Sequence, residues 1–235
     1  MSYILYDGPS LLDGQHIFTA LTGIENPSRN TKTGPMLHTW HMRSDIHPLE
    51  AVQTNADASV CGNCSLRGDH GKGRTCYVNL FRAPSQIFNH KDNFKRELPK
   101  ALFRNRAVRL GAYGDTASQP TSITAEIVKR AAMTTGYTHQ WHNCDPELKK
   151  YLMASCDSEE DREVAKALGW ATFRIKQPDQ PKLKYETTCP ASEEGGKVLN
   201  CLTCGRCSGG DTKDVVINVH GTGRKHFPIK LLEAA

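Results

Sequence analysis

Residues 107–176, AVRLGAYGDTASQPTSITAEIVKRAAMTTGYTHQWHNCDPELKKYLMASCDSEEDREVAKALGWATFRIK, decide the fold because β-type runs alternate in them with helix-type runs. The predicted elements are strands at 107–113, 136–141, 151–156 and 170–175, and helices at 121–134, 145–150 and 158–169. Such alternation favours parallel strands and the α/β class. We expect a complete or partial (β/α) barrel, and an open doubly wound sheet is the competing architecture.

The flanking segments extend this pattern in both directions. The repeat region begins near residue 85 with a predicted helix to about 104, interrupted near Pro99. Residues 1–60 contain the extended runs HIFTAL and MLHTWHM between turn-rich stretches, and we predict no helix there. After a Pro-rich connector, the run DVVINVHG predicts a buried strand. We expect a single α/β domain over 1–235.

Polar residues follow three of the predicted strands, where α/β folds place their functional groups. The turn YGD comes after the first strand, HQWHNC after the second and CDS after the third. Strand alternation would direct Tyr137, His139 and Trp141 to one face, and Gln140 to the other. We predict catalytic residues at these strand ends, namely Asp115, His139 and Gln140. A hydrogen-bonded structural histidine and a simple Asp turn are the alternatives.

Composition limits the class of protein. The chain is 38% hydrophobic, and 30 Lys and Arg against 25 Asp and Glu give a net charge of +5. No apolar run approaches the roughly 18 residues of a membrane span, so we predict a cytoplasmic protein without a membrane partner. Seven cations concentrate between residues 89 and 109, and they indicate either a solvated helix face or a surface for nucleic acid.

Nine cysteines in a cytoplasmic chain indicate metal ligation rather than disulfides. The second Cys-rich segment, 189–210, contains a four-Cys group made of Cys189, Cys201, Cys204 and Cys207. Its C-x-x-C-x-x-C core suits a [4Fe-4S] cluster, in which each iron takes one thiolate. A tetrahedral Zn²⁺ site is the alternative, followed by unliganded thiols.

The first Cys-rich segment, 61–82, contains a three-Cys group made of Cys61, Cys64 and Cys76. Three local ligands leave a fourth position that a distant Cys or His completes, or that stays open for substrate or cofactor. A zinc knuckle is the alternative here. Cys144 and Cys156 are predicted to be buried, inert thiols. Neighbouring Arg67, Arg74 and Arg206 are candidates to offset the charge of a cluster.

Several segments together carry a family resemblance. They are DGPSLLDG, NPSRNTKTGPMLHTWHMRSDIHP, CGNCSLR, TCYV, RLGAYGDTAS, TGYTHQW, CPASEEGGK and CLTCGRC. In these segments the chain resembles Cys-rich phage and mobile-element proteins of the "gene product 88" type, across nearly its whole length. That group is in turn distantly similar to radical S-adenosylmethionine barrels.

This resemblance implies that the three-Cys group holds a cluster after the first barrel strand. It also implies that Tyr113, Gly114 and Asp115 match the turn that grips the methionyl group of S-adenosylmethionine. The chain departs from the usual pattern in two respects. Eleven residues separate Cys64 from Cys76, where radical enzymes have C-x-x-x-C-x-x-C, and Asp115 replaces a Glu.

The leading hypothesis is therefore an iron-sulfur protein with one or two [4Fe-4S] clusters, acting as a radical-type or other oxidoreductase supplied by an electron donor. The alternative is a zinc-stabilised nucleic-acid-binding protein without catalysis, which uses the cations of residues 89–109. A third possibility is an iron-sulfur protein that binds DNA or a host protein and uses its clusters only to fold or to sense redox state.

Overall fold

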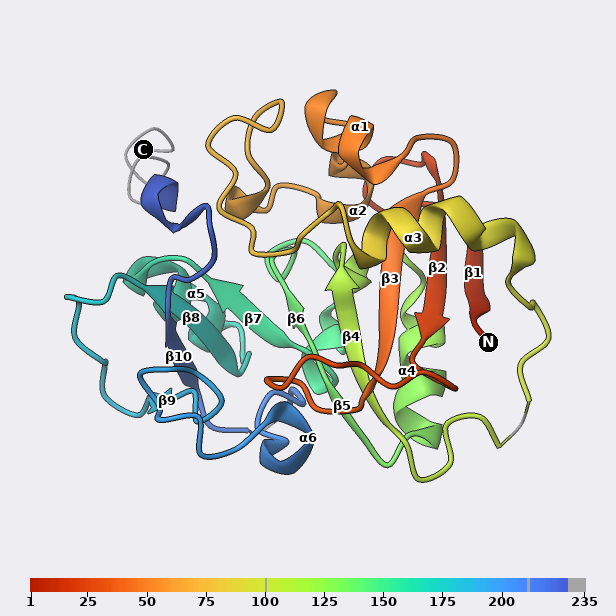
Figure 1. Ribbon diagram of the computed structural model, residues 1–235. Coiled ribbons are helices and arrows are strands. Elements are labelled where there is room, and N and C mark those ends of the chain that lie inside the picture. The colour runs from red at the N-terminus through yellow and green to blue at the C-terminus, as the bar shows by residue number, and fades with distance from the viewer. Residues whose placement is uncertain (100, 211, 228–235) are drawn as a thin grey trace.

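The computed structural model describes residues 1–99, 101–210 and 212–227, and places their strands in two five-stranded sheets (Figure 1). The first sheet has the order β1 (Tyr3–Pro9), β2 (His16–Thr22), β3 (Leu37–Arg43), β4 (Ala107–Tyr113) and β5 (Met133–Thr135). The second has the order β6 (Tyr137–Thr138), β7 (Met153–Cys156), β8 (Thr172–Lys176), β10 (Val215–Asn218) and β9 (Thr187–Thr188).

The helices are short, and most of the segments that connect one strand to the next are longer than any helix within them. The α-helices are α1 (Pro48–Gln53), α2 (Ala58–Cys61), α3 (Ala83–His90), α4 (Thr121–Arg130), α5 (Glu159–Ala167) and α6 (Cys201–Cys204). The 3-10 turns are η1 (Ser65–Arg67), η2 (Lys91–Asn93), η3 (Thr116–Ser118), η4 (Pro146–Lys150) and η5 (Arg224–His226). Figure 1 shows α4 and α5 behind the sheets, the first Cys-rich segment above them and α6 of the second Cys-rich segment below.

The α/β class predicted from the alternating pattern is confirmed. The second sheet is parallel throughout, and β3, β4 and β5 are parallel to one another in the first. The predicted strand at 107–113 is β4, and the run DVVINVHG supplies β10. Strand β1 was not predicted, and it makes an antiparallel start with β2 and β3 to the first sheet.

Local structure sets the start of α5 and the end of α4. Ser158 begins α5 by accepting a hydrogen bond from the backbone N–H of Asp161 at 3.0 Å, as the sequence predicts. The Asp161 carboxylate reaches back to the N–H of Asp157 instead of that of Ser158. Helix α4 ends at Arg130, earlier than predicted, because Ala131 turns to extended backbone that leads into β5.

Three predictions about elements were wrong. The helix predicted over 85–104 ends as η2, because Lys95 leaves it to form backbone hydrogen bonds with Ser2 and Ile4 at the edge of β1. Helix α1 lies in the region where none was predicted. The strand predicted over 136–141 is only β6, since the Thr138 hydroxyl accepts from the N–H of Gln140 and turns the chain.

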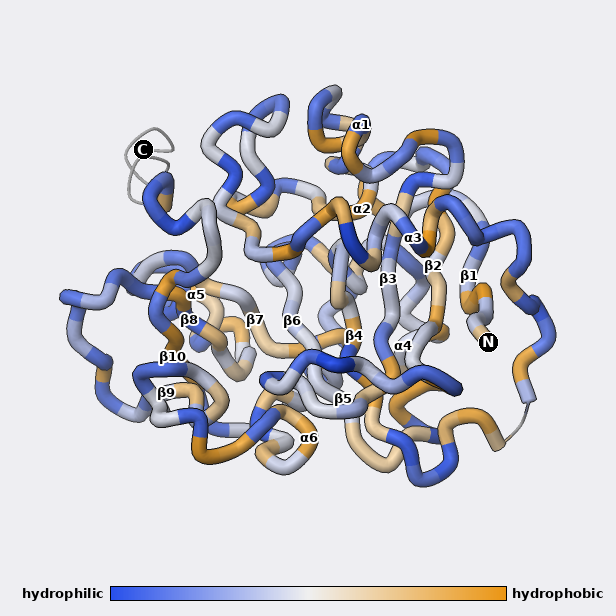
Figure 2. Tube along the Cα trace, in the orientation of Figure 1, coloured by the Kyte–Doolittle hydropathy of each residue, from blue (hydrophilic) through white to orange (hydrophobic). Residues whose placement is uncertain are grey.

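One apolar core joins the two sheets. It packs Val108 and Leu110 of the first sheet with Ala154 of the second and with Ile127 and Ala165 of the helices behind. Figure 2 shows that the loops at the periphery are mostly hydrophilic. A shared core of this kind makes the two sheets one packed unit. Among the described residues, no helix is both long and apolar enough to cross a membrane.

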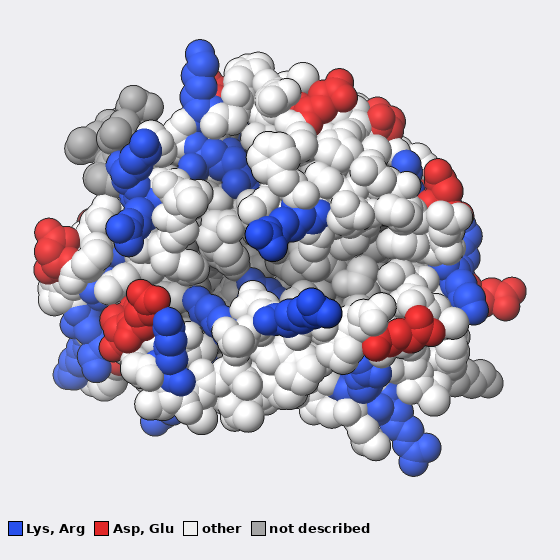
Figure 3. Space-filling model, viewed as in Figure 1, with Lys and Arg blue, Asp and Glu red and all other residues white. Residues whose placement is uncertain are grey.

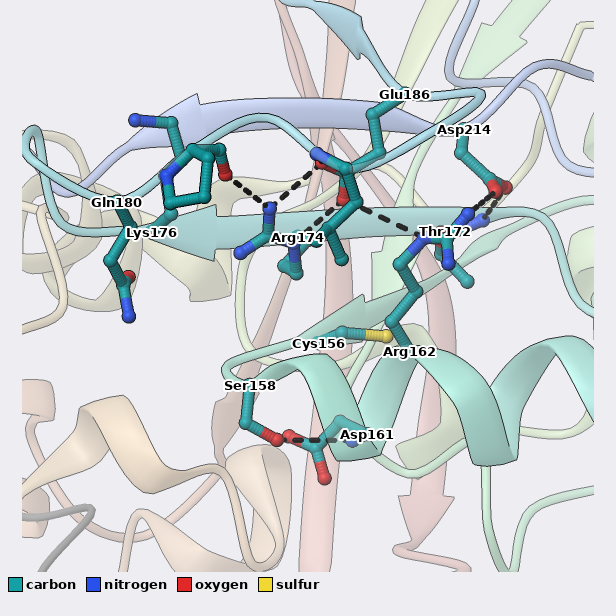
Figure 4. Close-up of polar contacts among 12 residues, drawn as sticks. Cys156, Ser158, Asp161, Arg162, Thr172, Arg174, Lys176, Gln180, Glu186 and Asp214 are labelled. Atoms are coloured by element: carbon teal, nitrogen blue, oxygen red, sulfur yellow. Dashed lines mark hydrogen bonds and ion pairs between the residues drawn. The ribbon is translucent and has the colours of Figure 1, made fainter.

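A buried ion-pair network ties the Pro-rich connector to the second sheet (Figure 4). Arg174 on β8 pairs with Glu186, and Arg162 on α5 pairs with Asp214 just before β10. All four side chains are buried, and Glu186 lies three residues before Cys189. The network therefore fixes both ends of the chain segment that carries the four-Cys group.

Candidate functional site

The two Cys-rich segments enclose one cavity of about 150 Å³, and every cysteine of the three-Cys group and the four-Cys group lines it. Figure 1 shows the first segment above the carboxyl end of β4, and α6 of the second segment at the opposite edge. Apolar side chains of β8 and β10, including Phe173 and Ile217, form the floor.

Tight turns bring the three-Cys group together. Cys61 ends α2, and Gly62 follows it with a φ of 56°, a conformation that favours glycine. The N–H of Cys64 donates to the Cys61 carbonyl at 3.2 Å, and the N–H of Cys76 donates to the Leu66 carbonyl at 2.9 Å. Burial raises the pKa of Cys61, and the nearby charges of Asp57, Cys64 and Cys76 raise it further.

The four-Cys group is held by α6 and by strand pairing. Cys201 and Cys204 are the ends of α6, which Asn200 caps and Gly205 terminates in the left-handed conformation. The N–H of Cys189 donates to the Val216 carbonyl at 2.9 Å. Burial raises the pKa of Cys207 to about 12, although a hydrogen bond from Tyr137 opposes this, and the other three thiols add to the rise.

The donor set of the two groups suits either an iron-sulfur cluster or zinc. Thiols alone form both groups, and thiolates are the ligands that iron-sulfur clusters take from proteins. Cys144 and Cys156 do not line the cavity. Cys156 is buried as predicted, whereas Cys144 is partly exposed, so the prediction of burial is wrong for Cys144. As the described side chains stand, no three Cys, His, Asp or Glu are grouped so that they could hold a metal ion.

The ends of β4, from the first sheet, and of β6 and β7, from the second, meet beside the three-Cys group. The Asp115 carboxylate accepts hydrogen bonds from the N–H groups of Ala117 and His139, at 3.0 and 2.8 Å. His139 lies 3.4 Å from the carboxylate of Asp157 and hydrogen-bonds Cys64. Burial would lower the pKa of His139, but Cys64 and Asp157 raise it well above its usual value.

The other predicted strand-end residues have structural contacts. The Gln140 amide donates to the Cys61 carbonyl at 3.0 Å and packs on Gly62, and Gln140 does not line the cavity. Trp141 turns into the core and donates to the Ser155 carbonyl, away from His139, so the predicted alternation fails after Thr138.

In the predicted cofactor turn, Tyr113 and Gly114 also line the cavity. The hydroxyl of Tyr113 is buried and has no hydrogen-bond partner among the described residues. Gly114 has a φ of 74°, and a Cβ there would lie 2.7 Å from the carbonyl oxygen of His41. Glycine at this position is therefore required by the close approach of β3.

Arg109 is a cavity residue that the sequence analysis counted only as one cation of the basic region. It lies on β4, is 8% exposed, and donates to the Tyr77 hydroxyl at 2.5 Å. Its guanidinium carbon is 6.0 Å from the centre of the Tyr137 ring. A lone Arg inside the apolar run AVRLGAY was the available signal, because buried strand positions seldom carry a charge.

The remaining cations of residues 89–109 do not share one helix face. Arg96 pairs with Asp7 at 2.7 Å, and Arg106 donates to the Gly23 carbonyl. Lys91 lies over the ring of Phe88, and Lys100 lies outside the described residues. The prediction of a solvated helix face is therefore wrong, because helical structure ends at Asn93.

Comparison of the chain with protein-family models, curated proteins and solved structures finds no match.

Proposed function

We propose that this protein is an iron-sulfur protein in which the three-Cys group and the four-Cys group each hold a cluster. The observation that carries the proposal is the convergence of all seven ligand-spaced cysteines, from segments more than a hundred residues apart, on one cavity. The two isolated cysteines stay outside it. A purely structural use of these thiols gives no reason for that separation.

The four-Cys group would bind a [4Fe-4S] cluster through Cys189, Cys201, Cys204 and Cys207, one thiolate for each iron. Such a cluster has no open position and serves as a structural centre or an electron relay. Arg206 lines the cavity beside these ligands. Its positive charge favours the anionic thiolates that ligation requires.

The three-Cys group would bind the second cluster and leave one iron open toward the cavity. When bound, that cluster would supply single electrons to a ligand, as a redox or radical-type enzyme requires. His139 would act as a positioning residue, because it is held by Asp157 and hydrogen-bonds the ligand Cys64. Hydrogen bonds to cluster sulfurs are one of the controls on reduction potential. An electron-donor protein would reduce this cluster.

S-adenosylmethionine is the cofactor we propose for the open position, and a partial (β/α) barrel is the corresponding architecture. The turn at Tyr113, Gly114 and Asp115 lies in the cavity wall beside the three-Cys group. Tyr113 offers a buried hydroxyl without a partner. Both Asp115 oxygens already accept backbone N–H groups, so the turn would grip through Tyr113.

Metal analysis tests the proposal directly. Protein purified without oxygen should contain about eight iron and eight sulfide per chain, with broad absorption near ~400 nm. Stoichiometric zinc in a colourless protein from iron-replete cells would contradict it. That result would favour the zinc-stabilised, nucleic-acid-binding alternative, whose affinity for DNA or RNA would fall steeply with salt.

Cysteine variants test the assignment of ligands. Cys201→Ser/Cys204→Ser should remove about four iron per chain, and Cys61→Ser/Cys64→Ser should remove the other four. Cys144→Ser is the matched control, because Cys144 lies outside the cavity, and it should retain full iron. Equal losses in all three variants would contradict the assignment. Equilibrium dialysis with S-adenosylmethionine tests the cofactor separately.

A further inference from the structure

Arg109 is a buried cation for which the described residues supply no anionic side chain as a partner. In the part of the chain that the structure describes, no carboxylate lies within ion-pair distance of its guanidinium, and the Tyr77 hydroxyl is its one hydrogen-bond acceptor. The guanidinium has five N–H donors, so most of them are free to bind a further group. A buried charge of this kind is costly unless an anion compensates it.

The charges around Arg109 also indicate an anion. Among the residues that the structure describes, the cations that line the cavity are Lys32, Arg67, Arg74, Arg109 and Arg206, and the carboxylates are Asp57 and Asp115. Arg67 forms an ion pair with Asp57 at 2.8 Å, and the Asp115 carboxylate accepts hydrogen bonds from backbone N–H groups. Figure 3 shows Lys and Arg side chains bordering the hollow in the centre of this face.

Tyr77 and His220 line the cavity on the side that leads from solvent to Arg109, and their contacts hold them in place. The ring of Tyr77 stacks on His220 with 4.9 Å between the ring centres, and Tyr77 is 46% exposed. Gly221 lets Tyr77 approach closely, since a Cβ at Gly221 would lie 3.0 Å from the Tyr77 Cβ. The exposed Tyr77 and the buried Arg109 are joined by a hydrogen bond, so one side of the cavity runs from solvent to the guanidinium.

We propose that Arg109 binds the carboxylate or phosphate group of a small anionic substrate inside the cavity between the two Cys groups. The planar fork of a guanidinium matches the two oxygens of either group. The Tyr137 ring, which packs on Phe173 at 4.3 Å between centres, supplies an apolar wall beside it for the rest of the molecule. The inference rests on the proposed function for what happens to the bound substrate, because it concerns the same cavity.

The negative charge of cluster thiolates is the competing explanation for Arg109, because Cys201 lies near its guanidinium. If Arg109 served only to offset that charge, its loss would release iron and the cavity would bind no small anion. If Arg109 binds substrate, its loss would weaken anion binding and leave the iron content unchanged. An experiment that measures both quantities on one sample therefore decides between the two roles.

Isothermal titration calorimetry of the anaerobically purified holoprotein tests the proposal, with inorganic phosphate and acetate as separate probes in a buffer free of both. We expect saturable binding of one equivalent of at least one probe, and the preferred probe identifies the anionic group. Arg109→Gln should weaken that binding by about tenfold or more. Arg109→Lys keeps the charge without the fork and should weaken it less, and it serves if the Gln variant does not fold.

Arg96→Gln is the control, because it removes the same charge from an exposed ion pair. It should bind the probe like the wild type, and all three variants should keep wild-type iron. Absence of saturable binding in an iron-loaded wild type would overturn the inference and leave the proposed function intact. Anion binding that depends on Arg109 in a protein without iron would support the inference and contradict the proposed function. Displacement of the probe by S-adenosylmethionine would place the cofactor carboxylate at Arg109 and overturn a substrate site there.

Discussion

Arg174 and Glu186 form a buried two-point ion pair, in which Nε donates to Oε1 at 2.6 Å and Nη2 donates to Oε2 at 2.8 Å. Both side chains are at most 1% exposed. Because Glu186 precedes Cys189 by three residues, this pair joins the core of the second sheet to the start of the four-Cys group. Its removal should disturb both the sheet and the site.

Arg174→Met should lower the free energy of unfolding by about 3 kcal/mol, because it removes the two-point partner of the buried Glu186 carboxylate and leaves it the longer ion pair to Arg162, at 3.6 Å. The double variant Arg174→Met/Glu186→Leu should recover part of that loss, since it leaves no buried charge at this pair. Urea denaturation followed by circular dichroism measures both. Arg96→Gln, in the exposed pair with Asp7, should cost less than about 1 kcal/mol. A double variant less stable than Arg174→Met would contradict this account.

Two buried histidines should make the protein sensitive to mild acid. Burial lowers the pKa of His41 to about 3, and burial together with the charge of Arg109 lowers that of His38 to about 4. Thr19 gives its one hydroxyl proton to Gln119, so His41 donates to Thr19 from Nδ1 and its buried Nε2 has no partner among the described residues. A second proton on His41 would therefore be buried without an acceptor.

The sign of the pH dependence follows from these lowered values. An unfolded His titrates near ~6.5, so the unfolded chain binds more protons than the folded one between about pH 6.5 and pH 4. Stability therefore decreases as the pH is lowered across that window. From pH 8 to pH 5 each histidine should contribute a loss of about 2 kcal/mol. Urea midpoints across this range should show a clearly flatter profile for His38→Gln/His41→Gln. Parallel profiles for variant and wild type would contradict the assignment.

Comparison of Gly114→Ala with Gly14→Ala should separate backbone strain from the close approach of β3. Gly114 and Gly14 have similar φ values, 74° and 77°, so alanine at either position pays the same left-handed penalty of about 1 to 2 kcal/mol. At Gly114 the Cβ would also lie 2.7 Å from the carbonyl oxygen of His41, whereas at Gly14 no atom lies within 4 Å. Thermal unfolding should therefore show a further loss of about 1 to 3 kcal/mol for Gly114→Ala alone. Equal losses would show that β3 yields to the added methyl group.

Tyr113→Phe should leave the metal-free protein as stable as the wild type, or more stable by about 1 kcal/mol. The substitution removes a buried hydroxyl that has no hydrogen-bond partner among the described residues, and so removes its desolvation penalty. Chemical denaturation of the chelator-treated protein measures this. The same variant should lose affinity for S-adenosylmethionine in dialysis. A destabilisation above about 1 kcal/mol would show that the hydroxyl supports the fold instead.

The sequence predicted the strands best where apolar residues were continuous. The run AVRLGAY is β4 over its full length, and Ser158 begins α5 as expected. The helix predicted to residue 104 was wrong because a tertiary contact, the pairing of Lys95 with the edge of β1, outweighed its helical pattern. Strand β6 is short because a hydrogen bond from the Gln140 N–H to the Thr138 hydroxyl turned the chain, and no periodicity predicts such a bond.

The candidate site could be predicted within segments but not between them. Spacing grouped the seven cysteines, and strand order brought Asp115 and His139 together. The placement of both Cys-rich segments on one cavity depends on the position of β10 between β8 and β9, and local sequence carries no signal for that strand order. Arg109 was missed because a count of charges does not distinguish a buried cation from an exposed one.

The position of β10 also has a consequence for synthesis of the chain. Strand β10 enters between two strands that precede it, and pairs with Phe173 on one side and Thr187 on the other through Val215. Until Val215 to Asn218 leave the ribosome, β8 has a bare hydrogen-bonding edge and β9 has no neighbour. The nascent chain would thus hold the four-Cys segment at its start, through Glu186, and insertion of β10 would fix its end through the ion pair of Asp214 with Arg162.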